Sequence, residues 1–188
     1  MLSSMNCYLV RHGKDDDSVR GGWSDAPLTE QGVEQVKALA DSLATDLQKN
    51  IVQIFSSDLP RARQTAEIIS QKINVPIMYL PQFRETNNGV LAGMKNTEAL
   101  QKYPGLFWNS LDWDEFYPEG ESPHVFYDRI QDAWYAFVDR IHDQNGDVLL
   151  VTHGVVINVI LYIVNGLEYS NKTNPFPIKH AELIPVKL

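Results

Sequence analysis

The sequence predicts an α/β protein with a mostly parallel central sheet. Short apolar runs alternate along the chain with segments of helical periodicity, which is the pattern of strands joined by crossover helices. The 188 residues are 44% hydrophobic and 21% charged, the composition of an ordinary globular domain with a substantial core. We find no repeat or interdomain linker, so residues 1–188 are treated as one domain.

Five apolar runs predict the strands, at residues 7–10, 51–55, 77–80, 147–152 and 181–186. Three of these runs lead into residues that can bind anions or move protons. The first is followed by Arg11 and His12, the second leads to Arg61, and the fourth is followed by His153. Because parallel strands end at one edge of a sheet, we expect these side chains to converge there.

Helices are predicted where apolar residues recur every three or four positions. The first is expected to have Thr29 as its N-cap and to continue to Leu47. Any of residues 56–58 could cap the second, with Pro60 in its first turn, and Ser122-Pro123 opens the third. A fourth, apolar helix follows the fourth predicted strand.

The net charge limits the partners that this chain can have. A formal charge of -8 argues against nucleic acid or an anionic membrane surface as the main partner. Any binding of an anion must therefore depend on a local group of cationic side chains. The apolar C-terminal half is compatible with a homodimer contact, but the sequence does not establish one.

The sequence predicts a cytoplasmic location for this protein. The single cysteine, Cys7, excludes an intrachain disulfide, and a reduced thiol within an apolar run fits a cytosolic protein. Residues 1–6 lack the pattern of an export signal, and no segment approaches transmembrane length.

The residues at the three strand ends suit the chemistry of phosphate. Arginine binds phosphate in a bidentate manner, and two arginines would neutralise one phosphoryl group. Nearby cations lower the pKa of a histidine and keep it neutral, as a nucleophile must be. Taken singly, Arg11-His12 could be a surface ion-pair partner, His153 a structural residue and Arg61 part of a solvated face. Their predicted convergence favours an active site.

Several motifs resemble those of the histidine phosphatase superfamily, and more narrowly its phosphoglycerate-mutase-like branch. They occur in the order of that family and span most of the chain. For a member of it we expect a three-layer α/β/α sandwich with a mostly parallel sheet and an inserted cap segment. The motifs are Leu9-Val10-Arg11-His12-Gly13, Leu28-Thr29-Glu30-Gln31-Gly32, Ser56-Ser57-Asp58-Leu59-Pro60-Arg61-Ala62-Arg63-Gln64-Thr65-Ala66, Arg84-Glu85, Pro118-Glu119-Gly120-Glu121-Ser122 and Val151-Thr152-His153-Gly154.

The resemblance implies a role for each catalytic candidate. His12 would be the nucleophile that becomes phosphorylated, and Arg11, Arg61 and His153 would form the phosphate pocket. Glu85 would protonate the leaving oxygen and then activate water against the phosphohistidine. From periodicity alone, Glu85 would instead be paired with the adjacent arginine.

The loop after Arg-His-Gly departs from the pattern of the mutases. Lys14 stands where they have glutamate, and Ser18 occupies the position of an asparagine. These differences favour a phosphatase over a phosphoglycerate mutase. Gly21 and Gly22 are candidate backbone donors to the substrate or plain turn residues, and Lys14 extends the cationic pocket or offsets the acidic residues beside it.

Residues 86–121 are the predicted cap over the pocket. Aromatic and acidic side chains alternate in this irregular segment, which suggests a surface that determines specificity. About half of the aromatics should simply pack the segment onto the core. An acidic, aromatic cap would repel polyanions, so we expect a substrate with one phosphate on a neutral or partly apolar body.

The predicted activity is therefore hydrolysis of a phosphomonoester through a phosphohistidine, acting on a small phosphorylated metabolite and releasing inorganic phosphate. We expect no cofactor and no metal, because the chain has no His-x-His or His-Glu-x-x-His pattern and arginine repels cations. The alternatives are a phosphoglycerate-type mutase that uses the same phosphohistidine, and a noncatalytic domain that binds a phosphorylated ligand.

Overall fold

The sheet of this protein is mostly parallel, as the sequence predicts. The computed structural model describes residues 6–46 and 49–188. Within them the strand order is β3-β2-β4-β1-β5; β5 is antiparallel to β1, and the other neighbouring strands are parallel. The strands are β1 (Cys7–Arg11), β2 (Ile51–Ser56), β3 (Ile77–Tyr79), β4 (Asp147–Thr152) and β5 (Leu183–Val186). Residues 1–5 and Leu47, on which predictions were made, lie outside the described residues.

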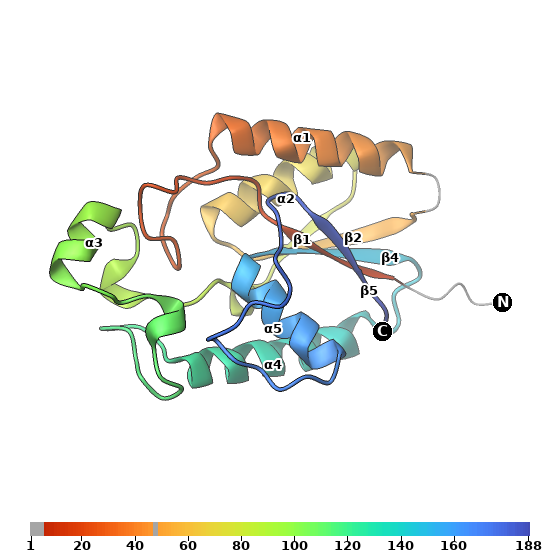
Figure 1. The fold of residues 1–188 in the computed structure, drawn as a ribbon. Coiled ribbons are helices and arrows are strands. Elements are labelled where there is room, and N and C mark those ends of the chain that lie inside the picture. The colour runs from red at the N-terminus through yellow and green to blue at the C-terminus, as the bar shows by residue number, and fades with distance from the viewer. Residues whose placement is uncertain (1–5, 47–48) are drawn as a thin grey trace.

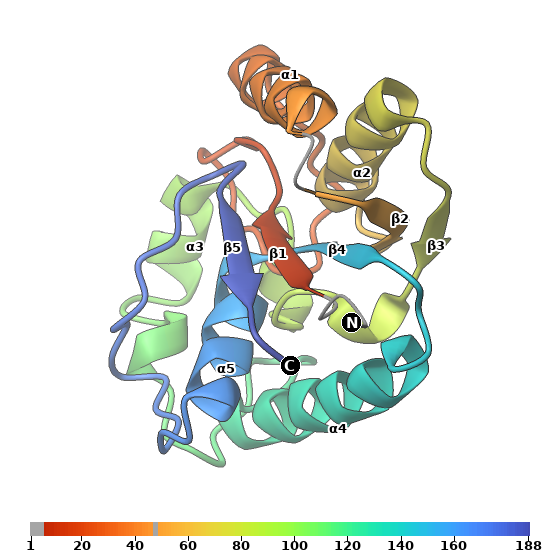
Figure 2. The same cartoon turned by 90° about the vertical axis from the view of Figure 1, so that its right-hand side faces the viewer.

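Helices cover both faces of the sheet and give three layers (Figures 1 and 2). One face carries α1 (Glu30–Thr45) and α2 (Pro60–Ile73), and the other carries α4 (Pro123–Ile141) and α5 (Gly154–Val164). Each interface between helices and sheet has its own buried apolar cluster, and β4 is buried along its whole length between the two. In the described part of the chain, no helix is both long enough and apolar enough to cross a membrane.

Two of the predicted helix caps are confirmed and one is wrong. The hydroxyl of Thr29 accepts a hydrogen bond from the Gly32 amide at 3.1 Å, and the hydroxyl of Ser122 caps α4 in the same way. None of residues 56–58 is the N-cap of α2. Leu59 holds that position without a side-chain bond, and Pro60 begins the helix.

The predicted convergence of the strand ends follows from the strand register. Arg11 at the end of β1 is aligned with Thr152 at the end of β4. Ser56 at the end of β2 is aligned with Val151, one residue earlier on β4. The loops that follow the three strands therefore leave the sheet side by side.

Residues 86–121 lie beyond this edge of the sheet and hold one short helix, α3 (Asn96–Lys102), with 3₁₀ turns before and after it (Figure 1). A third 3₁₀ turn, at Pro81–Phe83, precedes the segment. A small apolar cluster of its own holds the segment together, made by Leu91, Ala99, Leu111 and Tyr117. Backbone pairing between Val19 and Lys95 attaches the segment to the loop after β1.

Two glycines of the sequence motifs let the loop after β1 pack against the start of α1. A Cβ on Gly32 would lie 2.1 Å from the carbonyl oxygen of Lys14. A Cβ on Gly13 would lie 2.5 Å from the carbonyl oxygen of Gly32. Both approaches involve backbone atoms, which cannot move aside as the end of a flexible side chain could.

We therefore expect Gly32→Ala to destabilise the protein by about 1–3 kcal/mol, the usual cost of overpacking. The measurement is urea-induced unfolding of the variant and the wild type. Gly21→Ala is the matched control, because a Cβ at Gly21 meets nothing within 4 Å. Its effect should stay within about 0.5 kcal/mol. Equal stability of the two variants would contradict the close-packing argument.

Candidate active site

His12 follows β1 directly and is buried, with 4% of its surface exposed. Its Nδ1 lies 2.7 Å from the carbonyl oxygen of Gly13. A carbonyl only accepts hydrogen bonds, so Nδ1 carries the proton and Nε2 keeps its lone pair. The Nε–H of Arg61 donates to this Nε2 at 3.2 Å. Burial and then Arg61 hold the pKa of His12 well below its ordinary value, so the ring is neutral.

Arg61 lies in the first turn of α2 and is 2% exposed. Its guanidinium donates from Nη2 to the carbonyl oxygen of Gly22 at 2.7 Å and from Nη1 to that of Ser24 at 3.2 Å. A carboxylate oxygen of Asp15 lies 3.3 Å from its Nε. The buried charge thus has polar partners on every side.

His153 caps the start of α5 and is fully buried beside His12. The centroids of the two imidazole rings are 5.1 Å apart. The Nε2 of His153 lies 2.8 Å from the hydroxyl of Ser57. Burial, followed by the charge of Arg61, keeps the pKa of His153 well below its ordinary value.

Arg11 extends over the start of α5. Its Nη1 donates to the carbonyl oxygen of Ile178 at 2.5 Å. A Cβ on Gly154 would be in ordinary contact with Arg11, 3.5 Å from its Nε, so the guanidinium lies directly beside the start of the helix. Arg11 contributes to lowering the pKa of both His12 and His153, which means that its charge faces the same cluster.

Glu85 enters the same region from the loop before the cap segment. One carboxylate oxygen accepts from the amide of Thr86 at 3.1 Å and the other from the amide of Val155 at 3.2 Å. Burial raises the pKa of Glu85 despite the opposing effects of Arg61 and of these hydrogen bonds. The predicted alternative, an ion pair with Arg84, is wrong, because Arg84 binds Asp58 with two hydrogen bonds.

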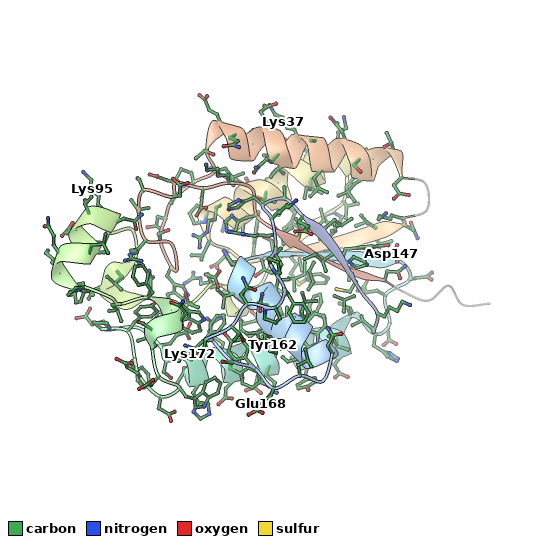
Figure 3. The ribbon with its side chains drawn as sticks, in the orientation of Figure 1. Lys37, Lys95, Asp147, Tyr162, Glu168 and Lys172 are labelled. Atoms are coloured by element: carbon green, nitrogen blue, oxygen red, sulfur yellow. The ribbon has the colours of Figure 1, made fainter. Side chains whose placement is uncertain are left out.

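A cavity of about 460 Å³ adjoins this cluster at Arg11 and Glu85. The segment 107–109 forms one wall, α5 a second, and residues 169–178 of the C-terminal segment a third. Lys172 lies in that last segment (Figure 3). Its ammonium donates to the carbonyl oxygens of Ser110 and Leu111, which follow the first wall in the chain. The lining side chains are mainly aromatic or amide: Phe107, Trp108, Asn109, Asn158, Tyr169, Asn171, Asn174 and Phe176.

The predicted loop residues lie near the cluster but differ in their contacts. Gly22 accepts from Arg61 through its carbonyl oxygen, and that of Gly21 accepts from Asn88 at 3.3 Å. The ammonium of Lys14 pairs with Asp17 at 3.4 Å, and Ser18 is exposed. The structure thus brings Arg11, His12, Arg61, Glu85 and His153 together with Gly22, and leaves Ser18 on the surface.

Sequence reasoning missed three sets of residues. Asp15 contacts Arg61, and His180 lies with its ring 5.7 Å from that of His12. Trp23 and Arg129 both donate to the carbonyl oxygen of Glu85, at 2.7 and 3.0 Å. The third set is residues 169–178, in the cavity wall. Asp15 and Trp23 lie between two of the sequence motifs, which could have marked them as site residues. His180, Arg129 and residues 169–178 come from distant parts of the chain and had no such signal.

In the described part of the chain, one group of side chains has the spacing of metal ligands: His12, Asp15 and His180, whose ligand atoms lie within 4.8 Å of one another. The guanidinium of Arg61 lies 3.3 Å from the same carboxylate, and Arg11 contributes to lowering the pKa of His180. Both positive charges oppose a cation at this position.

An α/β sheet with arginine and histidine gathered at its carboxyl edge defines a class of phosphate-handling protein, and the comparisons agree. The chain belongs to the histidine phosphatase superfamily (branch 1), whose sequence pattern matches residues 7–187. It is 35% identical over 169 residues to the "Probable phosphoglycerate mutase GpmB" of Escherichia coli O1:K1 / APEC, covering 87% of this chain and 76% of that protein.

Solved structures of the same fold include proteins of different activity. Bacillus stearothermophilus YhfR matches with a TM-score of 0.81 and 27% identity, covering 96% of this chain and 90% of that one. A mycobacterial glucosyl-3-phosphoglycerate phosphatase in complex with VO3 matches with a TM-score of 0.78 and 25% identity, covering 96% and 90%. The family therefore supports a phosphatase or mutase and does not separate them.

The low pKa of the two buried histidines predicts how stability depends on pH. Below the ordinary histidine pKa of about 6.5, His12 and His153 bind protons in the unfolded chain but not in the folded protein. Stability is therefore greatest above that pH and falls as the pH drops, by about 1.4 kcal/mol per pH unit for each histidine. Urea unfolding across about pH 5 to 7 measures this slope.

His153→Asn should remove one histidine's share of that slope. His142→Asn is the control, since the side chain of His142 is 80% exposed. An unchanged slope in His153→Asn would show that His153 is protonated in the folded state.

Proposed function

We propose that this protein hydrolyses a phosphomonoester through a phosphohistidine on His12. The observation that carries the proposal is the state of the His12 imidazole: its Nδ1 proton is held by Gly13, and its Nε2 lone pair faces a buried arginine. A neutral nucleophile beside a fixed cation is what attack on a phosphate anion requires.

In the first step, Nε2 of His12 attacks phosphorus, and the bond from phosphorus to the ester oxygen breaks. Arg11 and Arg61 stabilise the charge on the phosphoryl oxygens. The leaving oxygen takes a proton from the carboxyl group of Glu85. The raised pKa of Glu85 supports this role, because it makes the protonated acid more available than that of an ordinary glutamate.

In the second step, water attacks the phosphohistidine and the bond between phosphorus and nitrogen breaks. Glu85, now a carboxylate, accepts the proton of the attacking water. Inorganic phosphate leaves, and His12 returns to its neutral state. The amides of Thr86 and Val155 hold the carboxylate in place through both steps.

The cavity supports a substrate with one phosphate on a neutral, partly apolar body. Its lining is largely aromatic and amide, and the ammonium of Lys172 donates to the carbonyl oxygens of Ser110 and Leu111, outside the lining. Phe107 and Trp108 of the predicted cap line the cavity, whereas Trp113 and Phe116 lie outside the lining. The sequence predicted in addition that acidic cap residues repel polyanions. Those residues lie exposed outside this lining: Asp112, Asp114, Glu115 and Glu119.

A phosphoglycerate mutase is the second candidate, favoured by the relative from Escherichia coli. Against it, the predicted departures from the mutase pattern stand at Lys14, whose ammonium pairs with Asp17, and at the exposed Ser18. A mutase would return the phosphoryl group to phosphoglycerate, whereas a phosphatase releases it to water. Independence from metal and a cytoplasmic location remain part of the proposal.

Glu85→Gln should trap the phosphoenzyme when the substrate has a good leaving group, such as para-nitrophenyl phosphate. Such a leaving group needs no acid, but the water of the second step loses its base, so hydrolysis should slow by about 10²–10⁴-fold. The measurement is a rapid-quench assay for acid-labile phosphate on the protein.

The double variant that also carries His12→Asn should hold no phosphate, while the addition of His124→Asn, at an exposed position, should leave the trap intact. Phosphate retained without His12 would refute the assignment of the nucleophile. Isomerisation of phosphoglycerate by the wild type without release of phosphate would establish the mutase.

Phe176→Ala should lower kcat/KM for para-nitrophenyl phosphate by about tenfold, because it removes an apolar wall that binds the body of the substrate. Inhibition by inorganic phosphate, which has no body, should not change. Phe116→Ala is the control, since Phe116 is 56% exposed and lies outside the cavity lining. Equal changes for substrate and phosphate would contradict a separate site for the body.

A further inference from the structure

Asp15 brings a carboxylate to the cluster that faces the phosphate. One of its oxygens lies 3.3 Å from the Nε of Arg61, and the other lies 3.9 Å from the Nε2 of His180. Ligand atoms of His12, Asp15 and His180 all lie within 4.8 Å of one another. A phosphoryl group in reach of the His12 nitrogen is therefore close to this negative charge.

The backbone holds Asp15 in that position. Asp15 pairs with Leu28 in an antiparallel bridge. The adjacent Lys14 accepts hydrogen bonds at its carbonyl oxygen from both the amide and the hydroxyl of Thr29. The side chain of Asp15 is only 17% exposed, so solvent screens its charge weakly. The carboxylate is thus a fixed part of the site.

The charge of Asp15 is offset by the same arginines that would bind the phosphate. Burial and Arg11 lower the pKa of His180, which keeps that ring neutral. The ammonium of Lys14 is directed to Asp17 at 3.4 Å. Arg61 is the cation in direct contact with Asp15, and a bound phosphoryl group would interact with the same guanidinium.

We propose that Asp15 determines specificity by disfavouring substrates that carry a second anionic group beside the phosphate. The inference rests on the phosphate pocket of the proposed function and names the residue that selects within it. A phosphate ester with a neutral body meets Asp15 with one charged group, and Arg11 and Arg61 compensate for it. A phosphoglycerate adds a carboxylate on a short body, and a carboxylate that lies on the Asp15 side of the phosphate is repelled as well.

The test compares two substrates in the full-length protein. The quantity measured is the ratio of kcat/KM for hydrolysis of phosphoglycerate to kcat/KM for para-nitrophenyl phosphate. Asp15→Asn should raise this ratio by about tenfold, because it removes one like charge within a few ångströms. Asp17→Asn removes the same charge from the same loop at a side chain that is 83% exposed, and should change the ratio by less than about twofold. Asp15→Ser provides a second variant if the amide perturbs folding.

Calorimetry of phosphoglycerate and of inorganic phosphate gives a reading that does not need turnover. Asp15→Asn should increase the binding affinity for phosphoglycerate more than the affinity for inorganic phosphate. Absence of hydrolysis by the wild type would refute the proposed function, and calorimetry would still measure the effect of Asp15. An unchanged ratio in both assays, or a shift toward the neutral ester, would overturn the inference.

Discussion

The buried guanidinium of Arg61 is the interaction on which the rest of the site depends. Burying a charge is costly unless it is fully hydrogen-bonded, and Arg61 meets this need with carbonyl oxygens of the loop after β1 and with Asp15. Those bonds fix the loop beside His12. The same charge lowers the pKa of both buried histidines and orients the His12 imidazole through Nε2. One side chain thus links the fold of the loop to the protonation of the proposed nucleophile.

Rigid and variable parts of the protein divide the work of this site. The side chains of the proposed phosphate pocket lie at the ends of β1 and β4 and in the first turn of α2, where sheet and helix packing hold them. The cavity that would receive the body of the substrate has walls from the segment 107–109 and from the loop 169–178. Loops on a rigid scaffold are where related proteins differ in specificity. In the proposed function, the first part binds the phosphoryl group and the second part binds the body of the substrate.

The cluster at the carboxyl edge of the sheet carries a small positive charge. The cluster combines Arg11 and Arg61 with neutral histidines, so its positive charge suits one phosphoryl group. The carboxylate of Asp15, in contact with Arg61, reduces the positive charge of the cluster. The aromatic and amide side chains that line the cavity carry no charge. A protein with a net charge of -8 thus places two arginines together in one small region. Asp112, Asp114, Glu115 and Glu119 are exposed and lie outside the cavity lining.

The sequence by itself determined the α/β fold, the order of the strands along the chain, two of the three helix caps and the residues expected at the phosphate. These are local signals: apolar periodicity, a capping hydroxyl and motifs beside strand ends. Only the tertiary structure decided three other contacts. The hydroxyl of Ser57 contacts His153 and does not cap α2. Arg84 pairs with Asp58 instead of Glu85, and the carbonyl oxygen of Ile178 accepts from Arg11, 167 residues away. The physical reason is that side-chain partners across such separations are selected by packing and charge in three dimensions, which leave no periodic trace in the chain.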